Sequence, residues 1–379
     1  MSTSRRKFLE TAGLATAGWM IIKPELVRGT QANTAISVGV IGPGRRGTSD
    51  AAIMMRNPNA RVVALCDIYE DQLKEAQKRL TLENPRVYKD YQSLLASDVD
   101  AVLIATPPYQ HPEQFEAAVQ AKKHIFQEKP VGVDPAGCRR FAAAARRADP
   151  ARDIVVDFQQ RYGPGYVEAY NRVRRGDIGK INMVRTTWMT GDLPRRKGNW
   201  SQEEEKVRNW LFYRDRSGDI IVEQHVHSLD VANWFLGAHP IRATGGAGGR
   251  LVRTDIGDIL DHLSVTFEYP GGVLLSHSGN QFTRRFSRVV EEFWGATGGA
   301  EVSRSKVTVY DPNLGNWSLD ARQDITIDTV DQFFARIKSG KVENIGVAAA
   351  ESTLTGIMGR ISILERREVK WEEVASSTV

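Results

Sequence analysis

Three glycines between an apolar run and a helical pattern constrain the fold of this chain most strongly. Residues 35–41 read as a strand and residues 45–56 as a helix, with Gly42, Gly44 and Gly47 at their junction. This spacing permits a tight turn, a close approach of the backbone to a pyrophosphate, and packing of the helix on the sheet. The N-terminus of such a helix faces anionic phosphates. The sequence therefore predicts a dinucleotide-binding strand–helix unit.

Strand-like and helical patterns alternate from residue 36 to about residue 157. Strict alternation predicts a parallel, doubly wound α/β sheet of the Rossmann type. Further strands are expected at 60–67, 99–107, 123–130 and 152–159, and helices at 69–80, 111–122 and 134–148.

The pattern changes after about residue 160. A helix over 164–174 leads into alternating strand-like segments, and residues 269–273 carry a hairpin signal. An open, mostly antiparallel sheet is expected, which makes the C-terminal part an α+β domain. The remaining expected elements are strands at 180–190, 262–269, 271–279 and 288–296, one helix over 220–237, and helices at 329–340 and 346–364.

The chain has 379 residues, which suits two domains better than one core. We expect a nucleotide-binding domain over 33–160 and a substrate-binding and oligomerisation domain over 161–379. The helix at 346–364 is long and apolar enough to pack back onto the first domain.

The N-terminal residues 1–32 resemble a twin-arginine export signal. Arg5 and Arg6 precede Phe8 and Leu9, and Glu10 stands where that signal has a lysine. The hydrophobic run is too short and too rich in glycine and alanine for a transmembrane helix, so no integral membrane segment is expected. The signal predicts a periplasmic protein, exported folded. The alternative is a disordered basic N-terminus on a cytoplasmic protein.

Charge and cysteine content exclude several classes of protein. The net charge is +5 and the basic pairs lie in alanine-rich helical sequence, which indicates a solvated face and no nucleic-acid partner. Cys66 and Cys138 follow no zinc-type or CxxC spacing, so both are expected to be free thiols.

Asp67 lies 20 residues after Gly47, at the end of the second expected strand. A carboxylate there holds the ribose hydroxyls of the adenosine and repels a 2′-phosphate, which favours NAD over NADP. Arg45 and Arg46 keep NADP open as an alternative, because either could reach a phosphate.

The carboxyl ends of the next two strands should complete the cofactor site. Thr106 and Pro107 are expected on the nicotinamide side of the cleft, and His111 either borders the cofactor or only begins the next helix. Glu128 and Lys129 precede a proline at the following strand end. A lysine fixed there points to proton transfer and cofactor contact together.

These motifs resemble the GFO/IDH/MocA oxidoreductase family, which includes glucose–fructose oxidoreductase and inositol dehydrogenase. The resemblance covers essentially the whole chain after the signal. It implies that Lys129 touches both the nicotinamide ribose and a substrate hydroxyl, and that the peptide before Pro130 is often cis.

A second part of the resemblance is a helix carrying Glu223, His225, His227 and Asp230 after Gly218. Positions 223, 227 and 230 share one face of a continuous helix. His227 is the candidate acid/base, and Asp230 either orients its imidazole or holds the domain junction. Glu223 stands beside the substrate, in place of the family's aspartate.

Two departures from the family pattern affect the substrate side. Glu223 is one methylene longer than aspartate, and His225 replaces a small residue. Residues i and i+2 point about 200° apart on a helix, so the three side chains at 223, 225 and 227 are not expected to bind a metal.

Further substrate contacts are expected from residues that follow the last strand of the first domain and from aromatic faces. Arg161 and Tyr162 would border the cleft, beside Gln160, and Trp210 and the tryptophans of 188–200 could stack on a sugar ring. The alternative for each tryptophan is packing on the sheet or in a subunit interface.

The resemblance implies hydride transfer from a sugar or glycoside carbon, possibly C3, to a tightly bound NAD, with Lys129 and His227 handling the proton. A second interpretation is a glycosidase that uses NAD transiently, by oxidation, elimination and re-reduction. A third is a non-catalytic nucleotide-binding sensor. An open sheet predicts a homodimer or homotetramer.

Overall fold

The structure of this chain, a computed structural model, describes residues 35–321 and 324–376. The expected export signal over 1–32 lies outside these described residues. Within them, no helix combines the length and apolar character that a membrane crossing requires.

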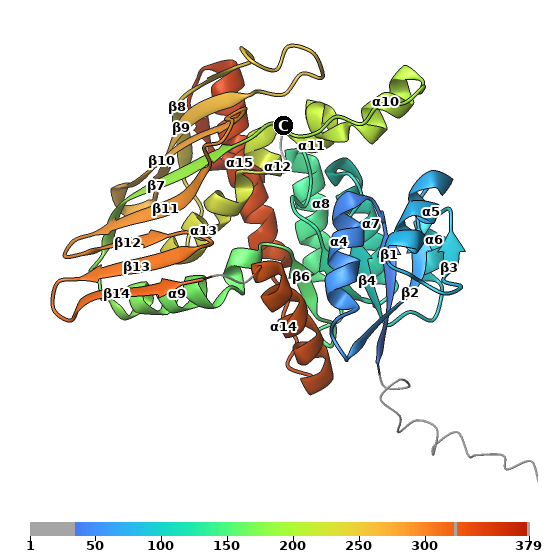
Figure 1. Cartoon of the computed structure of the whole chain (residues 1–379). Helices are drawn as coiled ribbons and strands as arrows, with labels where there is room; N and C mark the ends of the chain where they lie inside the picture. Colours follow the sequence, from blue (N-terminus) through green and yellow to red (C-terminus); the bar gives the residue numbers. More distant parts are fainter. Residues whose placement is uncertain (1–34, 322–323, 377–379) are drawn as a thin grey trace, which may run out of the picture. The chain divides into compact units, whose positions relative to one another are not determined.

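The first sheet is parallel and has the strand order β3-β2-β1-β4-β5-β6 (Figure 1). The order reverses between β1 and β4, and ligands of such sheets bind beyond the carboxyl ends of the strands at this point. The Rossmann fold is thereby confirmed. Its strands are β1 (Ile36–Ile41), β2 (Ala60–Cys66), β3 (Arg86–Tyr88), β4 (Ala101–Ile104), β5 (His124–Gln127) and β6 (Ile154–Val156).

Five helices follow the strands of this sheet. Strand β3 and helix α6 did not stand out in the sequence, because they are three and five residues long and mostly not buried. The helices are α4 (Arg45–Met54), α5 (Glu70–Arg79), α6 (Tyr91–Leu95), α7 (His111–Gln120) and α8 (Pro135–Arg146), with a 3-10 turn η1 (Pro108–Gln110) before α7.

The second sheet has nine strands in the order β14-β13-β12-β11-β7-β10-β9-β8-β15. Only β7 and β10 pair in parallel, so the expected open, mostly antiparallel sheet is confirmed. The hairpin at 269–273 is also present. The strands are β7 (Ile181–Thr190), β8 (Arg242–Gly249), β9 (His262–Tyr269), β10 (Val273–Gln281), β11 (Arg288–Gly295), β12 (Gly299–Val302), β13 (Lys306–Asp311), β14 (Gly315–Asp320) and β15 (Val369–Lys370).

Helix α15 (Gly346–Glu365) runs between the nine-stranded sheet and α8 of the first domain (Figure 1). A Cβ on Gly359 would lie 2.7 Å from Cζ of Phe267, so only glycine permits this approach of helix and sheet. Helix α14 (Ile325–Ser339) contacts α4. The other helical elements are η2 (Gln159–Arg161), α9 (Pro164–Arg175), α10 (Gln202–Arg208), η3 (Trp210–Phe212), α11 (Arg214–Ser217), η4 (Pro270–Gly272) and α16 (Trp371–Ala375).

The single helix expected over 220–237 was a wrong prediction. The chain forms two helices, α12 (Ile220–Glu223) and α13 (Val226–Leu236), which are separated at Gln224 and His225. The break turns the fully buried His225 ring toward His277 of β10, at 3.0 Å between Nδ1 and Nε2. Glu223 and His227 therefore come from different helices, and helical spacing does not relate them.

A buried carboxylate lies between α13 and the nine-stranded sheet. Glu291 of β11 accepts hydrogen bonds from Ser228 at 2.5 Å and from Tyr166 at 3.2 Å. Burial raises the pKa of Glu291 to about 7, although the two hydrogen bonds and Arg304 act to lower it. The carboxyl is therefore protonated in mildly acidic solution.

The pKa of Glu291 makes the stability of the fold depend on pH. Its folded value exceeds the ordinary 4.5, so the stability it contributes is full below pH 4.5 and is lost as pH rises through 7. We expect the free energy of unfolding to fall by about 3 kcal/mol across this window through this group. Denaturant unfolding of Glu291→Gln should show a smaller fall. An unchanged pH dependence in the variant would show that Glu291 is not the titrating group.

Candidate active site

The glycine loop leaves an open space beside its second glycine. A Cβ on Gly42 would lie 2.7 Å from the Thr106 nitrogen, and a Cβ on Gly47 would lie 2.3 Å from the Gly42 carbonyl oxygen. At Gly44 the nearest atom would be Nη2 of Arg196, at 4.0 Å. Gly44 is also the N-cap of α4 and provides no side-chain cap. The loop therefore fits an anionic pyrophosphate at Gly44.

Two alanine substitutions separate the ligand space from the packing of the loop. Gly44 has φ −70°, which alanine adopts freely, so Gly44→Ala should leave the melting temperature unchanged. The added methyl group should raise the Kd for NAD about 10-fold or more, the scale of an overpacked contact. Gly47→Ala is the control, because it should lower the melting temperature. Calorimetric titration and thermal unfolding measure both; equal NAD affinity for Gly44→Ala and the unchanged protein would contradict the assignment.

Asp67 follows β2 and lies half-buried, as expected for a ribose-binding carboxylate. It accepts a hydrogen bond from the Tyr69 nitrogen at 2.8 Å. Burial raises its pKa, and the Tyr69 hydrogen bond and the charges of Arg196 and Arg208 counter this effect. Thr106 and Pro107 lie half-buried after β4, beside this loop. These residues fit the adenosine and the nicotinamide halves of a dinucleotide.

Arg46, considered from the sequence as a possible phosphate ligand, binds carboxylates within the protein. Its guanidinium binds Glu128 at 2.6 Å and Asp50 at 3.2 Å, and also Asp157. Glu128, predicted to lie at the cofactor, is thus a member of this cluster. Arg45 is exposed.

The cluster around Arg46 holds three buried carboxyl groups. Burial acts to raise the pKa of Glu128, but the charges of Arg46 and Lys129 lower it to about 2. Burial and the charge of Glu128 raise the pKa of Asp157 to about 7. Asp50 and Asp157 were not predicted from the sequence. Two signals in the sequence were available. Arg46 and Asp50 stand at i, i+4 spacing, and Asp157 is the lone acid after the apolar β6.

Lys129 and Glu223 form an ion pair at the centre of the site. The Lys129-Pro130 peptide is cis, as the family resemblance implied. Nζ of Lys129 donates to Oε1 of Glu223 at 2.7 Å and to the Glu223 carbonyl oxygen. Their side chains are 12% and 11% exposed. The longer side chain of Glu223 therefore ends on Lys129.

His227 lies close enough to Lys129 for the lysine charge to lower its pKa, and it is 5% exposed. Its ring stacks on Trp188 at 5.6 Å between centroids, and it meets Phe158 edge-on at 6.0 Å. Its Nδ1 is buried without a hydrogen-bond partner among the described residues. Burial, and then the charge of Lys129, lowers the pKa of His227 well below 6.5. His227 is therefore neutral near pH 7 and able to accept a proton.

Asp230 does not orient His227. Both oxygens of Asp230 accept from Arg161, each at 2.8 Å, and Oδ1 also accepts from Ser352 at 2.7 Å. Arg161 follows β6, and Ser352 lies on α15, so Asp230 has the other role considered for it and links elements at the domain junction. Arg161 was expected to contact substrate, but this bidentate pair occupies its guanidinium.

Three other predicted site residues are occupied within the protein. The Tyr162 hydroxyl donates to Glu343 at 2.6 Å, and His225 is bonded to His277. Both were predicted to contact substrate. The His111 ring lies 2.6 Å from the Pro130 oxygen and 2.8 Å from the Thr106 oxygen, and the side chain is 1% exposed. His111 therefore holds together two loops of the site, one after β4 and one at Pro130.

The two tryptophans considered from the sequence as sugar-stacking residues lie in different elements. Trp188 was named only within a tryptophan-containing segment, yet it packs directly on His227. Trp210 lies half-buried in η3.

The described residues contain no group of three or more His, Cys, Asp or Glu side chains arranged to hold a metal ion.

Comparison with known proteins agrees with this geometry. Residues 36–152 match the family described as "Oxidoreductase family, NAD-binding Rossmann fold", and residues 166–301 match the "GFO/IDH/MocA C-terminal domain". The chain is 27% identical over 351 residues to the myo-inositol 2-dehydrogenase of Thermotoga maritima, covering 89% of this chain and 99% of that protein.

Two further relatives extend the comparison. The crystal structure of a probable dehydrogenase from Thermotoga maritima has a TM-score of 0.71 at 25% identity and covers 89% of this chain and 100% of its own. The 2,7-anhydro-N-acetylneuraminate hydratase of Escherichia coli is 27% identical over 242 residues, which are 63% of this chain and 60% of that protein. This chain belongs to the GFO/IDH/MocA family and is an NAD-binding oxidoreductase.

Proposed function

We propose that this protein oxidises a secondary alcohol of a sugar, cyclitol or glycoside, possibly at C3 of a sugar ring, with an NAD that it holds tightly. The observation that carries the proposal is the Lys129–Glu223 ion pair beside a neutral, buried His227. A fixed cation and a proton acceptor side by side suit the conversion of an alcohol to a carbonyl group. The myo-inositol 2-dehydrogenase of Thermotoga maritima, similar over nearly its full length, supports a cyclic polyol as substrate.

Each residue has a distinct task in the proposed reaction. NAD, when bound, supplies the acceptor for the hydride that leaves the substrate carbon. Lys129 donates a charge-assisted hydrogen bond to the substrate oxygen and stabilises the forming carbonyl group. His227 takes the hydroxyl proton. Glu223 holds the ammonium group of Lys129 in place.

Unpaired polar atoms around the site favour a ligand with several hydroxyl groups. Nε1 of Trp188, Nδ1 of His227 and both amide atoms of Gln160 are buried without partners among the described residues. Buried donors and acceptors cost free energy when they stay unpaired, and a polyol supplies both kinds of partner. The indole of Trp188 also provides an apolar face of the kind on which sugar rings pack.

A redox glycosidase is the second candidate, because one relative carries the name of a hydratase. A protein of this kind oxidises a substrate carbon, eliminates a leaving group from the activated intermediate, and returns the hydride. It consumes no NAD overall. The same Lys129 and His227 would serve both the oxidation and the return step.

A panel of inositols, free sugars and aryl glycosides separates these functions. Net formation of reduced nicotinamide with an inositol or a sugar supports the dehydrogenase. Release of the aryl alcohol without net reduction supports the glycosidase. Binding of ligands without either reaction would contradict both and favour a sensor.

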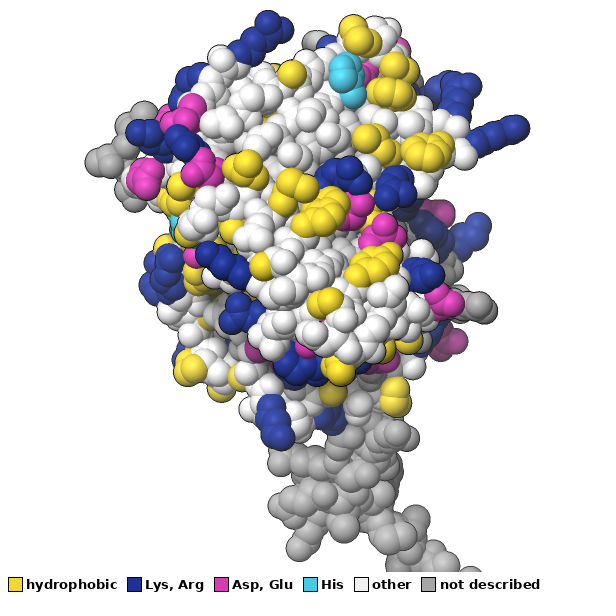
Figure 2. Space-filling view, turned by 90° about the vertical axis from the view of Figure 1, so that its left-hand side faces the viewer, with side chains coloured by type: hydrophobic (Ala, Val, Ile, Leu, Met, Phe, Trp, Pro, Cys, Tyr) yellow, Lys and Arg dark blue, Asp and Glu magenta, His cyan; other side chains and the backbone are white. Residues whose placement is uncertain are grey.

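We also propose that the protein assembles through the open face of its nine-stranded sheet. Met183, Trp294, Leu274 and Tyr310 follow one cross-strand row, and three of them are about 45% exposed. Figure 2 looks onto the side where this sheet lies and shows apolar side chains between polar and backbone atoms. Light scattering of the purified protein tests this, and a monomer at micromolar concentration would contradict it.

Export is the remaining proposal. We infer that the arginine pair Arg5-Arg6 directs the folded protein across the inner membrane to the periplasm. Cell fractionation should find the protein in the periplasm, and a lysine pair in place of the arginines should retain it in the cytoplasm. Equal distribution of the two forms would contradict the signal.

A further inference from the structure

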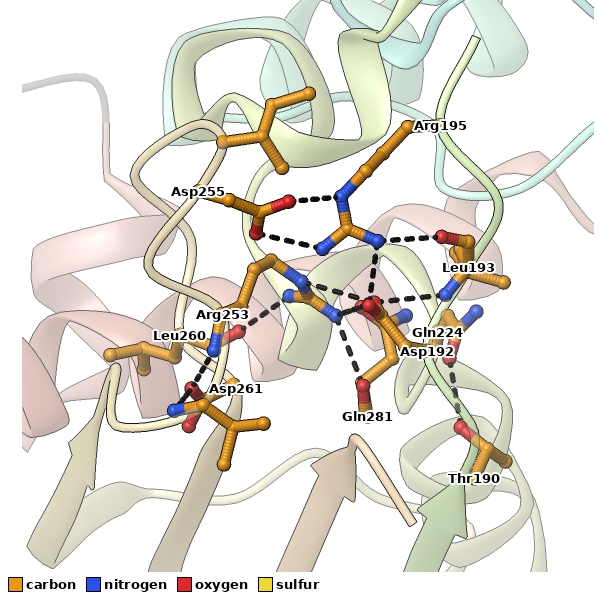
Figure 3. A network of polar contacts seen from close by, with 12 residues as sticks. Thr190, Asp192, Leu193, Arg195, Gln224, Arg253, Asp255, Leu260, Asp261 and Gln281 are labelled. Atoms are coloured by element: carbon orange, nitrogen blue, oxygen red, sulfur yellow. Dashed lines mark hydrogen bonds and ion pairs between the residues drawn. The ribbon is translucent and has the colours of Figure 1, made fainter. Parts of the chain in front are cut away.

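The segment of residues 191–217, which we call the strap, connects β7 to α12 and crosses to the nucleotide-binding domain. Its root is fixed on the nine-stranded sheet by the network in Figure 3. Arg253, which is 2% exposed, donates to Asp192 at 2.9 Å and to Gln281 at 2.5 Å. Arg195 binds Asp192 at 2.7 Å and Asp255 at 2.8 Å. The root of the strap is therefore rigidly placed.

The far side of the strap lies against the cofactor-binding edge of the parallel sheet. Arg208 binds Asp71 at 2.7 Å and covers the ring of Tyr69 at 4.0 Å. Arg216 covers the ring of Tyr109, in η1, at 4.5 Å. Tyr69 and Tyr109 follow β2 and β4 closely, so the strap spans the carboxyl ends of these strands.

A buried side chain fixes the backbone of Arg196 within the strap. Asn209, which is 4% exposed, accepts from the Arg196 nitrogen at 2.8 Å and donates to the Arg196 carbonyl oxygen at 3.1 Å. Its amide also donates to Glu205 at 3.0 Å. Arg196 thus projects from a fixed point.

The guanidinium of Arg196 differs from those of the other arginines in the strap. Arg196 donates to the neutral Gln72 at 2.9 Å, and among the described residues it forms no ion pair within 4.0 Å. Its Nη2 is the nearest atom to the open side of Gly44. The others each bind a carboxylate: Arg195, Arg208, Arg214 and Arg216.

The charged groups near Arg196 leave its guanidinium able to bind an anion. Asp67 and Asp71 lie close enough to favour its charged form, while Arg45 and Arg208 disfavour it. Burial and Arg208 together lower its pKa from the ordinary arginine value. A phosphate at the glycine loop would give this guanidinium the planar, bidentate partner that it lacks.

We propose that Arg196 is a ligand of the pyrophosphate of the bound dinucleotide, supplied by the substrate domain across the open side of Gly44. The inference rests on NAD binding and not on the identity of the substrate. The strap and the cofactor then hold each other in place, because release of NAD requires Arg196 and the strap to move away. This arrangement suits an oxidoreductase that retains its cofactor between turnovers.

Binding measurements with Arg196→Ala test the proposal without any substrate. Calorimetric titration with NAD and with ADP-ribose should show a roughly 10- to 100-fold loss of affinity, the scale of one charge-assisted hydrogen bond. Adenosine, which carries no phosphate, should bind equally to both proteins. Stopped-flow displacement should show faster release of NAD. Lys197→Ala removes the same charge from the exposed neighbouring residue and should change none of these values.

Three other results of these binding measurements would overturn the proposal. Unchanged affinity for NAD and ADP-ribose would overturn the proposal. A loss of affinity confined to NADP would assign Arg196 to a 2′-phosphate. An equal loss of affinity for adenosine would show that the strap, and not the phosphate contact, supports binding. Either result would also overturn the proposal. Arg196→Lys keeps the charge and should lose less affinity than Arg196→Ala, which guards against a folding defect in the alanine variant.

Discussion

Lys129→Met is expected to lower kcat at least about 100-fold, the scale of a lost proton-handling group, while NAD still binds. Methionine keeps the length and apolar stem of lysine and removes only the ammonium group. The forming carbonyl oxygen then loses its hydrogen-bond donor, and the loss falls on kcat more than on KM. Steady-state kinetics and NAD titration of the same preparation measure the two effects.

Glu223, the partner of Lys129, provides a control that separates loss of activity from loss of stability. Removing Lys129 leaves the buried Glu223 carboxylate unpaired, which destabilises a protein by about 3 to 5 kcal/mol in comparable cases. The double variant Lys129→Met/Glu223→Gln removes that unpaired charge, so it should fold normally and remain inactive. Glu223→Gln alone keeps the ammonium group and should retain much more activity. Near-normal turnover of the double variant would contradict the role of Lys129.

His227→Asn is expected to lower kcat roughly 100-fold or more and to remove the acidic limb of the pH–rate profile. Burial and the charge of Lys129 lower the pKa of His227 below 6.5, so the neutral base is lost only in more acidic solution. The unchanged protein should therefore keep its activity through pH 6.5 and lose it only in much more acidic solution. Initial rates across pH, with NAD in excess, measure this limb.

His225→Asn is the matched control for His227→Asn, because it changes the same residue type two positions away. The His225 ring is hydrogen-bonded to His277, which lies on β10 of the nine-stranded sheet. Its replacement should lower the melting temperature and leave the shape of the pH–rate profile unchanged. A larger loss of kcat in the His225 variant than in the His227 variant would reverse the assignment of the base.

The parts of the site that follow from local pattern were predictable. Gly42, Gly44 and Gly47 lie in one turn, and Asp67 ends the neighbouring strand, so spacing alone places them at one edge of a parallel sheet. The alternation of strands and helices likewise determines the doubly wound topology. Neither inference needs a contact between distant segments.

The contacts that the sequence could not predict are those of polar residues whose partners are remote in sequence. Arg161 binds Asp230, 69 residues away, and Tyr162 binds Glu343, 181 residues away. A polar residue near a cleft can face the ligand or another residue, and only tertiary contacts decide between them. The same applies to His111, whose ring lies between carbonyl groups of two loops.

Arg196 is a candidate ligand residue that the sequence pattern did not indicate. It stands beside Arg195 in a segment without helical or strand periodicity, and the sequence does not distinguish the two. The structure separates them, because Arg195 binds Asp192 and Asp255 while Arg196 faces the glycine loop. Roles of this kind depend on packing between domains.

Transfer of deuterium from the substrate to the nicotinamide is the direct test of hydride transfer at this site. A substrate found in the panel is labelled with deuterium at the oxidised carbon and mixed with the NAD-bound protein for a single turnover. We expect the reduced nicotinamide to carry the deuterium and its formation to be slowed by the label. Both the dehydrogenase and the glycosidase require this step. An oxidised product with no deuterium in the nicotinamide, or a hydrolysed product in which hydrogen from solvent has replaced the deuterium, would contradict hydride transfer at this site.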